Sequence, residues 1–244
     1  MTTNIRVAFA FLTRLPVASP ALTVESMSRA APWFPVVGLA VGAAMGAIRA
    51  LAGMALDPAS ATVLALLGAI LLTGGLHEDG LADCADAVGA HASPERRREI
   101  LHDPRVGTFG ALALIFAVTF AVAALAPLDA EHFLRAALAA HVIGRLSTVV
   151  IACLTRPGSR AGSAQMLQPG NLASALSAIS TLAVLVAITG AAASGIALAA
   201  SASVSAIAAL TIKHAIGSLN GDALGAINTL AALAAYGALG AQWS

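Results

Sequence analysis

The chain has 244 residues, of which 59% are hydrophobic and only 10% are charged, and its mean hydropathy is +0.87. A soluble domain typically carries about 25% charged residues, so too few polar groups are present here to cover a water-facing surface. This excludes an ordinary soluble domain and indicates that lipid surrounds much of the chain. The net charge of +1 says little about partners, and we expect no nucleic-acid partner. Two cysteines, Cys84 and Cys153, are too few for a disulfide framework, and we expect both to be thiols.

Long apolar runs predict the fold class: an all-α, polytopic membrane helical bundle with about seven transmembrane helices, forming a single integral membrane domain over residues 1–244. The segment Ile5–Val17 is too short to cross a bilayer and favours an interfacial helix, and we see no cleavable signal peptide. The predicted spans are Trp33–Leu56, Ala59–Leu76, Gly107–Leu125, Phe133–Leu154, Leu172–Gly190, Gly195–Ile212 and Ala223–Gly240.

Three glycines at four-residue spacing, Gly38, Gly42 and Gly46, fall on one face of the first predicted span. Small residues on one face let a neighbouring helix backbone approach closely in lipid. We therefore interpret this stripe as a packing surface.

The basic residues predict the orientation, because Lys and Arg concentrate in cytoplasmic loops. With a cytoplasmic N-terminus, three stretches, 76–110, 155–171 and 213–222, lie together on the cytoplasmic side. The basic residues on this side are Arg6, Arg14, Arg29, Arg96, Arg97, Arg98, Arg105, Arg156, Arg160 and Lys213, whereas the opposite loops carry Asp57, Asp129 and Glu131.

Seven of the twelve acidic residues lie between Leu76 and Gly110. Among them, Asp79, Asp83 and Asp86 share one helix face, within roughly 60°. Carboxylates so close repel one another unless a cation compensates them, and hard oxygen ligands suit Mg²⁺ or Mn²⁺. Gly80 leaves space beside Asp79 for a phosphate. The alternative is a solvated acidic helix end stabilised by the helix dipole.

The segment from His102 to Gly110 joins Asp103 and Arg105 to glycines where a span begins. Exposed amides at such a helix start, together with an arginine, predict a phosphate-binding site. The run Arg96–Arg98 fits two interpretations equally well: contacts with anionic substrate and lipid headgroups, or topology alone.

Two further ionisable residues lie near apolar segments. Arg145 is near the middle of its predicted span, where charged groups usually face the bundle interior and serve function, although a structural ion pair is the alternative. Asp222 lies between a glycine and the last span, where it could complete the metal site, act as a base, or simply stabilise the helix N-terminus.

Five motifs, in this order, resemble the cobalamin synthases, which are adenosylcobinamide-GDP ribazoletransferases. The motifs are Phe11–Val17, Trp33–Gly38, Gly74–Asp83 with Asp86, Asp103–Gly110 and Asn220–Ala226. The departures are Cys84 and Asn220, which stand where the family commonly has Thr. Glu78 occupies a position that varies in the family.

The resemblance implies an integral membrane transferase that joins adenosylcobinamide-GDP to α-ribazole, or to its 5′-phosphate, and releases GMP. It implies Mg²⁺, contacts with membrane lipid and a place in the inner (plasma) membrane of a bacterium, with 76–110, 155–171 and 213–222 as the active-site loops; a homo-oligomer is compatible with it. Together with the spacing of the carboxylates, we expect Asp79, Asp83 and Asp86 to hold Mg²⁺ and Asp86 or Asp222 to be the catalytic base. The expected substrate-binding residues are His77, Gly80, Arg98, Asp103, Arg105, Gly107, Thr108, Arg145, Lys213 and Asn220.

Two other functions compete with this hypothesis. A membrane phosphotransferase of the CDP-alcohol type has a similar aspartate cluster, but its motif places Ala-Arg soon after Asp-Gly, whereas Asp83 follows Ala82 here. A small transporter would place its acids deep within spans, whereas these acids lie at span ends.

Overall fold

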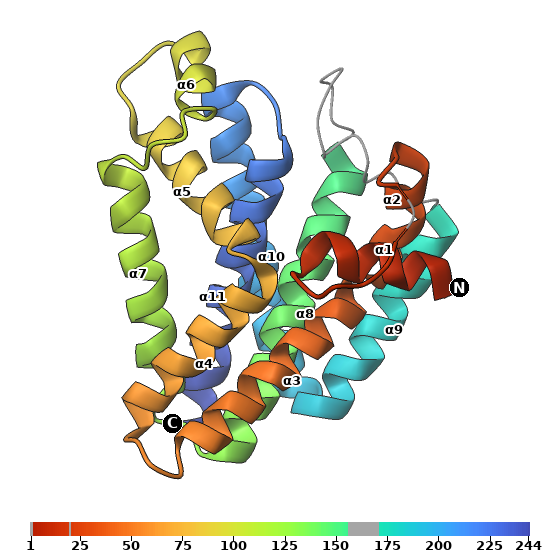
Figure 1. Cartoon of the computed structure of the whole chain (residues 1–244), viewed down its shortest axis with the longest axis vertical. Helices are drawn as coiled ribbons and strands as arrows, with labels where there is room; N and C mark the ends of the chain where they lie inside the picture. The colour runs from red at the N-terminus through yellow and green to blue at the C-terminus, as the bar shows by residue number, and fades with distance from the viewer. Residues whose placement is uncertain (1, 20, 156–170) are drawn as a thin grey trace.

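The computed structural model describes residues 2–19, 21–155 and 171–244, and the regular structure in these residues is entirely helical, which confirms the predicted fold class (Figure 1). The elements are α1 (Thr2–Leu12), α2 (Val24–Ala30), the 3₁₀ helix η1 (Ala31–Trp33), α3 (Phe34–Ala52), α4 (Pro58–Thr73), α5 (Leu76–Gly89), α6 (Pro94–Ile100), α7 (Thr108–Leu125), α8 (Ala130–Thr155), α9 (Asn171–Thr189), α10 (Ala191–Ile216) and α11 (Gly221–Trp243).

Five helical segments of the described chain are long and apolar enough to cross a membrane: 24–52, α7, α8, α10 and α11. Helices α4 and α5 pass the same test only as a pair, and the pair is bent by 93°, so it forms a broken sixth span or a re-entrant loop. The predicted span Ala59–Leu76, which we expected to end at Thr73-Gly74-Gly75, forms α4 as far as Thr73. Helix α9 is apolar over Leu176–Thr189.

Large apolar side chains point outward from these helices. In water such a surface would be costly, but in a bilayer it is solvated by lipid chains. The exposed residues include Leu64, Leu67 and Leu71 on α4, Leu112, Ile115 and Phe116 on α7, and Ile207 and Leu210 on α10. The structure is thus that of a membrane protein.

The glycine stripe packs α3 against α8, as the sequence predicts. A Cβ atom added at Gly38 would lie 2.5 Å from the His141 carbonyl oxygen, and one at Gly42 would lie 2.7 Å from the Ala137 oxygen. These contacts are with backbone atoms, which cannot move aside as a side chain can. The close approach brings the middle of α8 to the centre of the bundle.

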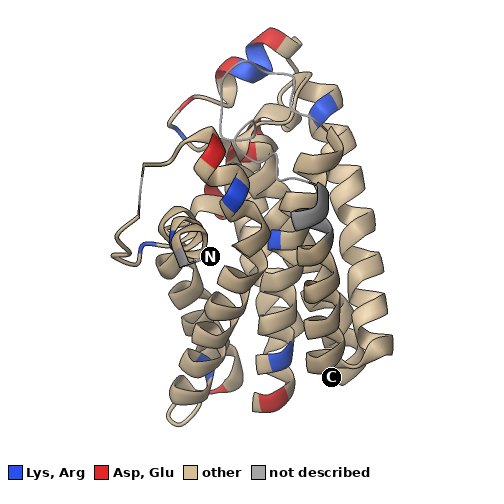
Figure 2. Ribbon diagram, turned by 90° about the vertical axis from the view of Figure 1, so that its right-hand side faces the viewer, with Lys and Arg blue, Asp and Glu red and all other residues tan. Residues whose placement is uncertain are grey.

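The polar segments gather at one end of the molecule. Helices α5 and α6 and the α10–α11 turn lie together at the top of Figure 1, and the α3–α4 and α7–α8 turns lie at the opposite end. Figure 2 shows that most charged residues collect toward the α6 end, while the long helices carry few. The stretches 76–110 and 213–222 therefore share one end, as predicted. Residues 156–170 of the third predicted loop lie outside the described residues.

Candidate active site

A sharp turn between α4 and α5 presents the acidic stretch. Gly74 and Gly75 both adopt left-handed backbone conformations, with φ of 71° and 70°, which side chains other than glycine rarely adopt. The Gly75 amide donates to the Ile70 carbonyl at 3.0 Å, which closes the end of α4. The chain then begins α5 at an angle of 93° to α4, so the acids of α5 lie at the polar end of the bundle.

The acids of α5 are brought close to an acid of α11. Asp79, Asp86 and Asp222 all lie close enough to Asp83 to repel its carboxylate. Asp79 also repels the carboxylate of Asp222. Even so, within the described chain no three His, Cys, Asp or Glu side chains are already grouped closely enough to hold a metal ion. The structure thus gathers the predicted ligands at one place without forming a finished coordination sphere.

Gly80 allows α11 to approach α5. A Cβ atom at Gly80 would lie 2.6 Å from the Asp222 carbonyl oxygen. The space beside Gly80 is therefore filled by the backbone of α11, and the expectation that a phosphate lies there is wrong. The glycine instead brings Asp222 next to Asp79 and Asp83.

Asn220 fixes the position of Asp222. Its side-chain oxygen accepts from the Ala223 amide at 3.0 Å, which caps α11, and its Nδ2 donates to Asp222 Oδ2 at 2.8 Å. This residue, expected to bind substrate, orients an acid of the site in the described structure.

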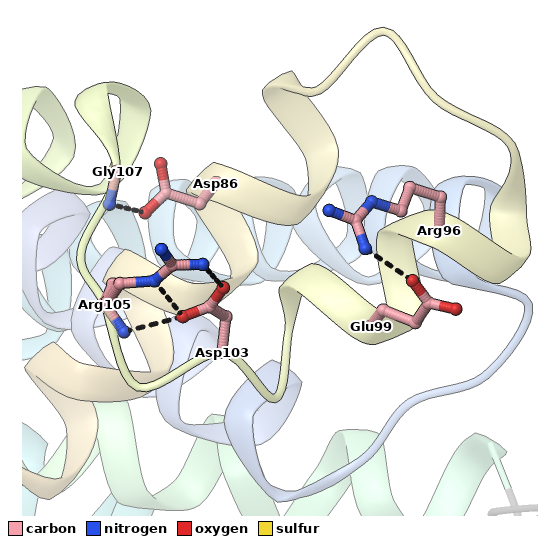
Figure 3. A network of polar contacts seen from close by, with 6 residues as sticks. All are labelled: Asp86, Arg96, Glu99, Asp103, Arg105 and Gly107. Atoms are coloured by element: carbon pink, nitrogen blue, oxygen red, sulfur yellow. Dashed lines mark hydrogen bonds and ion pairs between the residues drawn. The ribbon is translucent and has the colours of Figure 1, made fainter.

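Asp86 binds the start of α7 (Figure 3). Its carboxylate accepts from the Gly107 amide at 2.7 Å and from the Gly110 amide at 2.8 Å. These two amides are satisfied within the protein, so the expectation that they are exposed for a phosphate is wrong. The sequence could not show this, because the acceptor lies more than twenty residues earlier, on another helix.

Arg105 is likewise bound within the chain. Its amide, Nε and Nη2 donate to the Asp103 carboxylate at 3.1, 2.9 and 2.6 Å (Figure 3). These bonds lower the pKa of Asp103 to about 2, so the carboxylate stays ionised at ordinary pH. The pair stiffens the loop between α6 and α7, and substrate would have to share or displace Asp103 to bind Arg105.

The arginines of α6 also contact protein groups. Arg96 pairs with Glu99 at 2.6 Å (Figure 3), and Arg98 Nε donates to the Ile216 carbonyl at 2.9 Å. The latter bond joins α6 to the last turn of α10. Arg98 therefore has a structural role, in addition to any contact with substrate.

Two cavities adjoin the acids. The bend cavity, about 540 Å³, lies at the α4–α5 turn, and the inner cavity, about 300 Å³, extends between α5, α8 and α11. Asp79 lines both. Other residues lining the bend cavity include Arg14, Glu78 and Val106, and those lining the inner cavity include Phe11, Phe34, His77, Arg145 and Asp222.

The remaining predicted substrate contacts divide into two groups. His77 and Arg145 are buried and line the inner cavity. Thr108, at the start of α7, and Lys213, in the last turn of α10, are exposed at the polar end and line neither cavity.

Two basic residues for which the sequence predicts no site role lie near the acids. Arg14 lines the bend cavity with Asp79, and His102 lies within electrostatic range of both Asp83 and Asp222. The signal for Arg14 was its place within the motif Phe11–Val17. His102 directly precedes Asp103, the first residue of another motif.

Comparison with known proteins identifies the family. The family model described as cobalamin-5-phosphate synthase matches residues 4–240. The chain belongs to this family. The predicted resemblance is thereby confirmed, and the chain is an enzyme of cobalamin biosynthesis.

Similar proteins include two adenosylcobinamide-GDP ribazoletransferases that align over most of their length. The one from Azorhizobium caulinodans is 38% identical over 244 residues, covering 95% of this chain and 92% of that protein. The one from Bradyrhizobium diazoefficiens is 36% identical over 229 residues, covering 91% and 87%. No solved structure matches the chain.

Proposed function

We propose that the chain transfers the adenosylcobinamide phosphate of adenosylcobinamide-GDP to α-ribazole, or to its 5′-phosphate, and releases GMP. The names of the full-length relatives support this reaction. The observation that carries it in the structure is the meeting of α5 and α11, which brings four carboxylates together; two of them, Asp79 and Asp222, line cavities that each contain an arginine.

In this reaction a ribose hydroxyl oxygen attacks the phosphorus on the corrinoid side of the diphosphate. A new P–O bond forms, the P–O bond to GMP breaks, and the hydroxyl proton moves to a carboxylate. We assign the proton to Asp222, because both oxygens of Asp86 already accept backbone amides. Asn220 holds Asp222 in place for this transfer.

We propose that Asp79 and Asp83 hold Mg²⁺, with Asp86 contributing through the second lone pairs of its oxygens. Mg²⁺ is usually bound through one or two carboxylates together with substrate phosphates, so a finished three-residue cluster is not required before substrate binds. An all-oxygen donor set whose members repel one another fits such an ion. When bound, the ion would neutralise the diphosphate.

We propose that this polar end faces the cytoplasm of a bacterium and that the helices cross its inner membrane. The arginines of α6 lie at this end (Figure 1), and Arg105 follows in the loop from α6 to α7, in agreement with the positive-inside rule. The exposed apolar side chains then contact lipid.

The test is GMP release from purified enzyme supplied with adenosylcobinamide-GDP, α-ribazole 5′-phosphate and Mg²⁺. We expect release from the native enzyme and a loss of at least about 100-fold in Asp83→Asn, since positioning and charge neutralisation supply nearly all of the catalysis in phosphoryl transfer. Asp129→Asn, which alters an exposed acid at the opposite end, should keep native activity. Full activity in Asp83→Asn contradicts the proposed site.

A further inference from the structure

Arg145 is a buried cation with unused hydrogen-bond donors. Only 1% of its surface is exposed, in the middle of α8. Its Nη1 donates to the His141 carbonyl at 3.1 Å and contacts His141 Nδ1 at 3.1 Å. Among the described residues, Nε and Nη2 have no hydrogen-bond partner. An arginine buried in this way is costly unless a ligand or an acid compensates it.

No carboxylate of the described chain forms an ion pair with Arg145. Glu78 is the acid that attracts the Arg145 guanidinium, but the two side chains do not come within ion-pair distance. Among the described residues, Glu78 Oε2 is itself buried without a hydrogen-bond partner. Both residues line a separate cavity of about 70 Å³, which His141 also lines. The guanidinium therefore keeps two donors, Nε and Nη2, for a ligand.

The inner cavity connects this guanidinium to the acids of the active site. Arg145 lines it together with Asp79 and Asp222. Two aromatic rings of its wall, Phe11 and Phe34, stack with their centroids 6.0 Å apart. A ligand that fills the cavity thus meets an apolar aromatic wall, a buried cation and the proposed catalytic acids.

The groups of the two substrates differ in whether their size and charge suit this cavity. A corrin ring is too large for about 300 Å³, and the diphosphate must lie at the acids for the reaction to occur. The guanine base would fit but is neutral, so it would leave the charge of Arg145 uncompensated. A nucleotide with an aromatic base and a terminal phosphate monoester supplies both the apolar surface and two negative charges.

We propose that Arg145 binds the 5′-phosphate of α-ribazole 5′-phosphate in the inner cavity, and so selects the phosphorylated acceptor. This inference rests on the proposed function for the identity of the acceptor. Binding there holds the ribose near Asp222, which accepts the hydroxyl proton. The guanidinium acts as a binding group and takes no part in proton transfer.

The experiment is equilibrium binding, measured by isothermal titration calorimetry on the full-length enzyme in detergent. The probes are α-ribazole 5′-phosphate, α-ribazole and GDP, and the proteins are the native enzyme, Arg145→Gln, Arg145→Lys and Arg135→Gln. Arg135 is the matched control, because it is a partly exposed arginine on the same helix that pairs with Glu131. Melting temperatures identify any variant that fails to fold.

We expect the native enzyme to bind the phosphorylated acceptor about 10- to 100-fold more tightly than α-ribazole, the range for hydrogen bonds to charged groups. Arg145→Gln should remove this preference while leaving α-ribazole affinity within about threefold, and Arg145→Lys should keep part of it, because lysine has the charge without the planar donors. Arg135→Gln should match the native enzyme.

Three results would overturn the assignment: no preference in the native enzyme, a preference that survives in folded Arg145→Gln, or a loss of GDP affinity in that variant in place of acceptor affinity. If Arg145→Gln does not fold, the comparison is between the native enzyme and Arg145→Lys, and an undiminished preference for the phosphorylated acceptor in Arg145→Lys overturns the assignment. Failure of the proposed reaction is distinguishable, because an enzyme that binds as expected but releases no GMP contradicts the reaction and not the binding site.

Discussion

At the scale of single residues, Asp86 combines two roles that the sequence could not separate. Helical spacing alone predicts that Asp79, Asp83 and Asp86 share a face. The structure adds that Asp86 also caps α7, across a chain separation that no local pattern reveals. The position of Asp222 beside them likewise depends on tertiary packing, through the close contact at Gly80.

Removing the Asp86 cap should destabilise the protein more than removing its neighbour. We expect Asp86→Ala to lower the free energy of unfolding by about 1–2 kcal/mol, because two amides of α7 lose their acceptor. Asp83→Ala should cost less, since Asp83 is repelled by three acids and accepts no such bond from α7 in the described structure. Denaturant titration in detergent measures both, and equal losses would count against the cap.

At the scale of elements, the helical spacing of the glycine stripe predicted that a neighbouring helix packs closely on α3, and the structure identifies that helix as α8. We expect Gly42→Ala to lower the free energy of unfolding by about 1–3 kcal/mol, because the new Cβ would lie 2.7 Å from backbone atoms of α8. Gly195→Ala is the control: no atom lies within 4 Å of its Cβ position, and alanine favours the helix. The same titration should show it unchanged or slightly more stable, and a harmless Gly42→Ala would contradict the close approach.

Hydropathy predicted that the apolar run Ala59–Leu76 ends at Thr73-Gly74-Gly75, but it could not predict the angle between α4 and α5. Its cause is local: Gly74 and Gly75 can both take positive φ. Because of the bend, the chain leaves the direction of α4 and continues as the acidic helix α5 at the polar end of the bundle.

Gly75 tests the bend through backbone strain alone, since no atom lies within 4 Å of its Cβ position. We expect Gly75→Ala to cost about 1–2 kcal/mol of stability and to reduce GMP release, because it disfavours the conformation that orients α5. Gly75→Asn should lose less of both, since asparagine tolerates positive φ better. If alanine and asparagine behave alike, φ at this position does not control the site.

At the scale of the whole molecule, charge and hydropathy predicted the fold class and the grouping of polar segments at one end. They could not predict the cavities, because these depend on how α5, α8 and α11 pack. They also could not show that Gly107, Gly110 and Arg105 already have protein partners. A prediction based on the motifs alone assumes that such groups are available to bind substrate.

The orientation in the membrane has a direct test with introduced cysteines. In a background with Cys84 and Cys153 replaced by Ser, we expect Ser93→Cys, before α6, to react with a membrane-impermeant maleimide in inside-out vesicles and not in intact cells stripped of their outer membrane. Met54→Cys, in the α3–α4 turn at the opposite end, should show the reverse. Labelling of Ser93→Cys only from the outer face would place the acids on the wrong side.

The central claim is that the acids at the meeting of α5 and α11 bind a divalent ion together with a diphosphate. Its most direct test is Mn²⁺ binding in the presence of GDP, followed by electron paramagnetic resonance, in the native enzyme, Asp83→Asn and Asp129→Asn. We predict that the native enzyme and Asp129→Asn bind Mn²⁺ equally and that Asp83→Asn binds it at least about 10-fold more weakly, since even residues that only orient metal ligands contribute that much. Equal Mn²⁺ affinity in all three proteins would contradict the account.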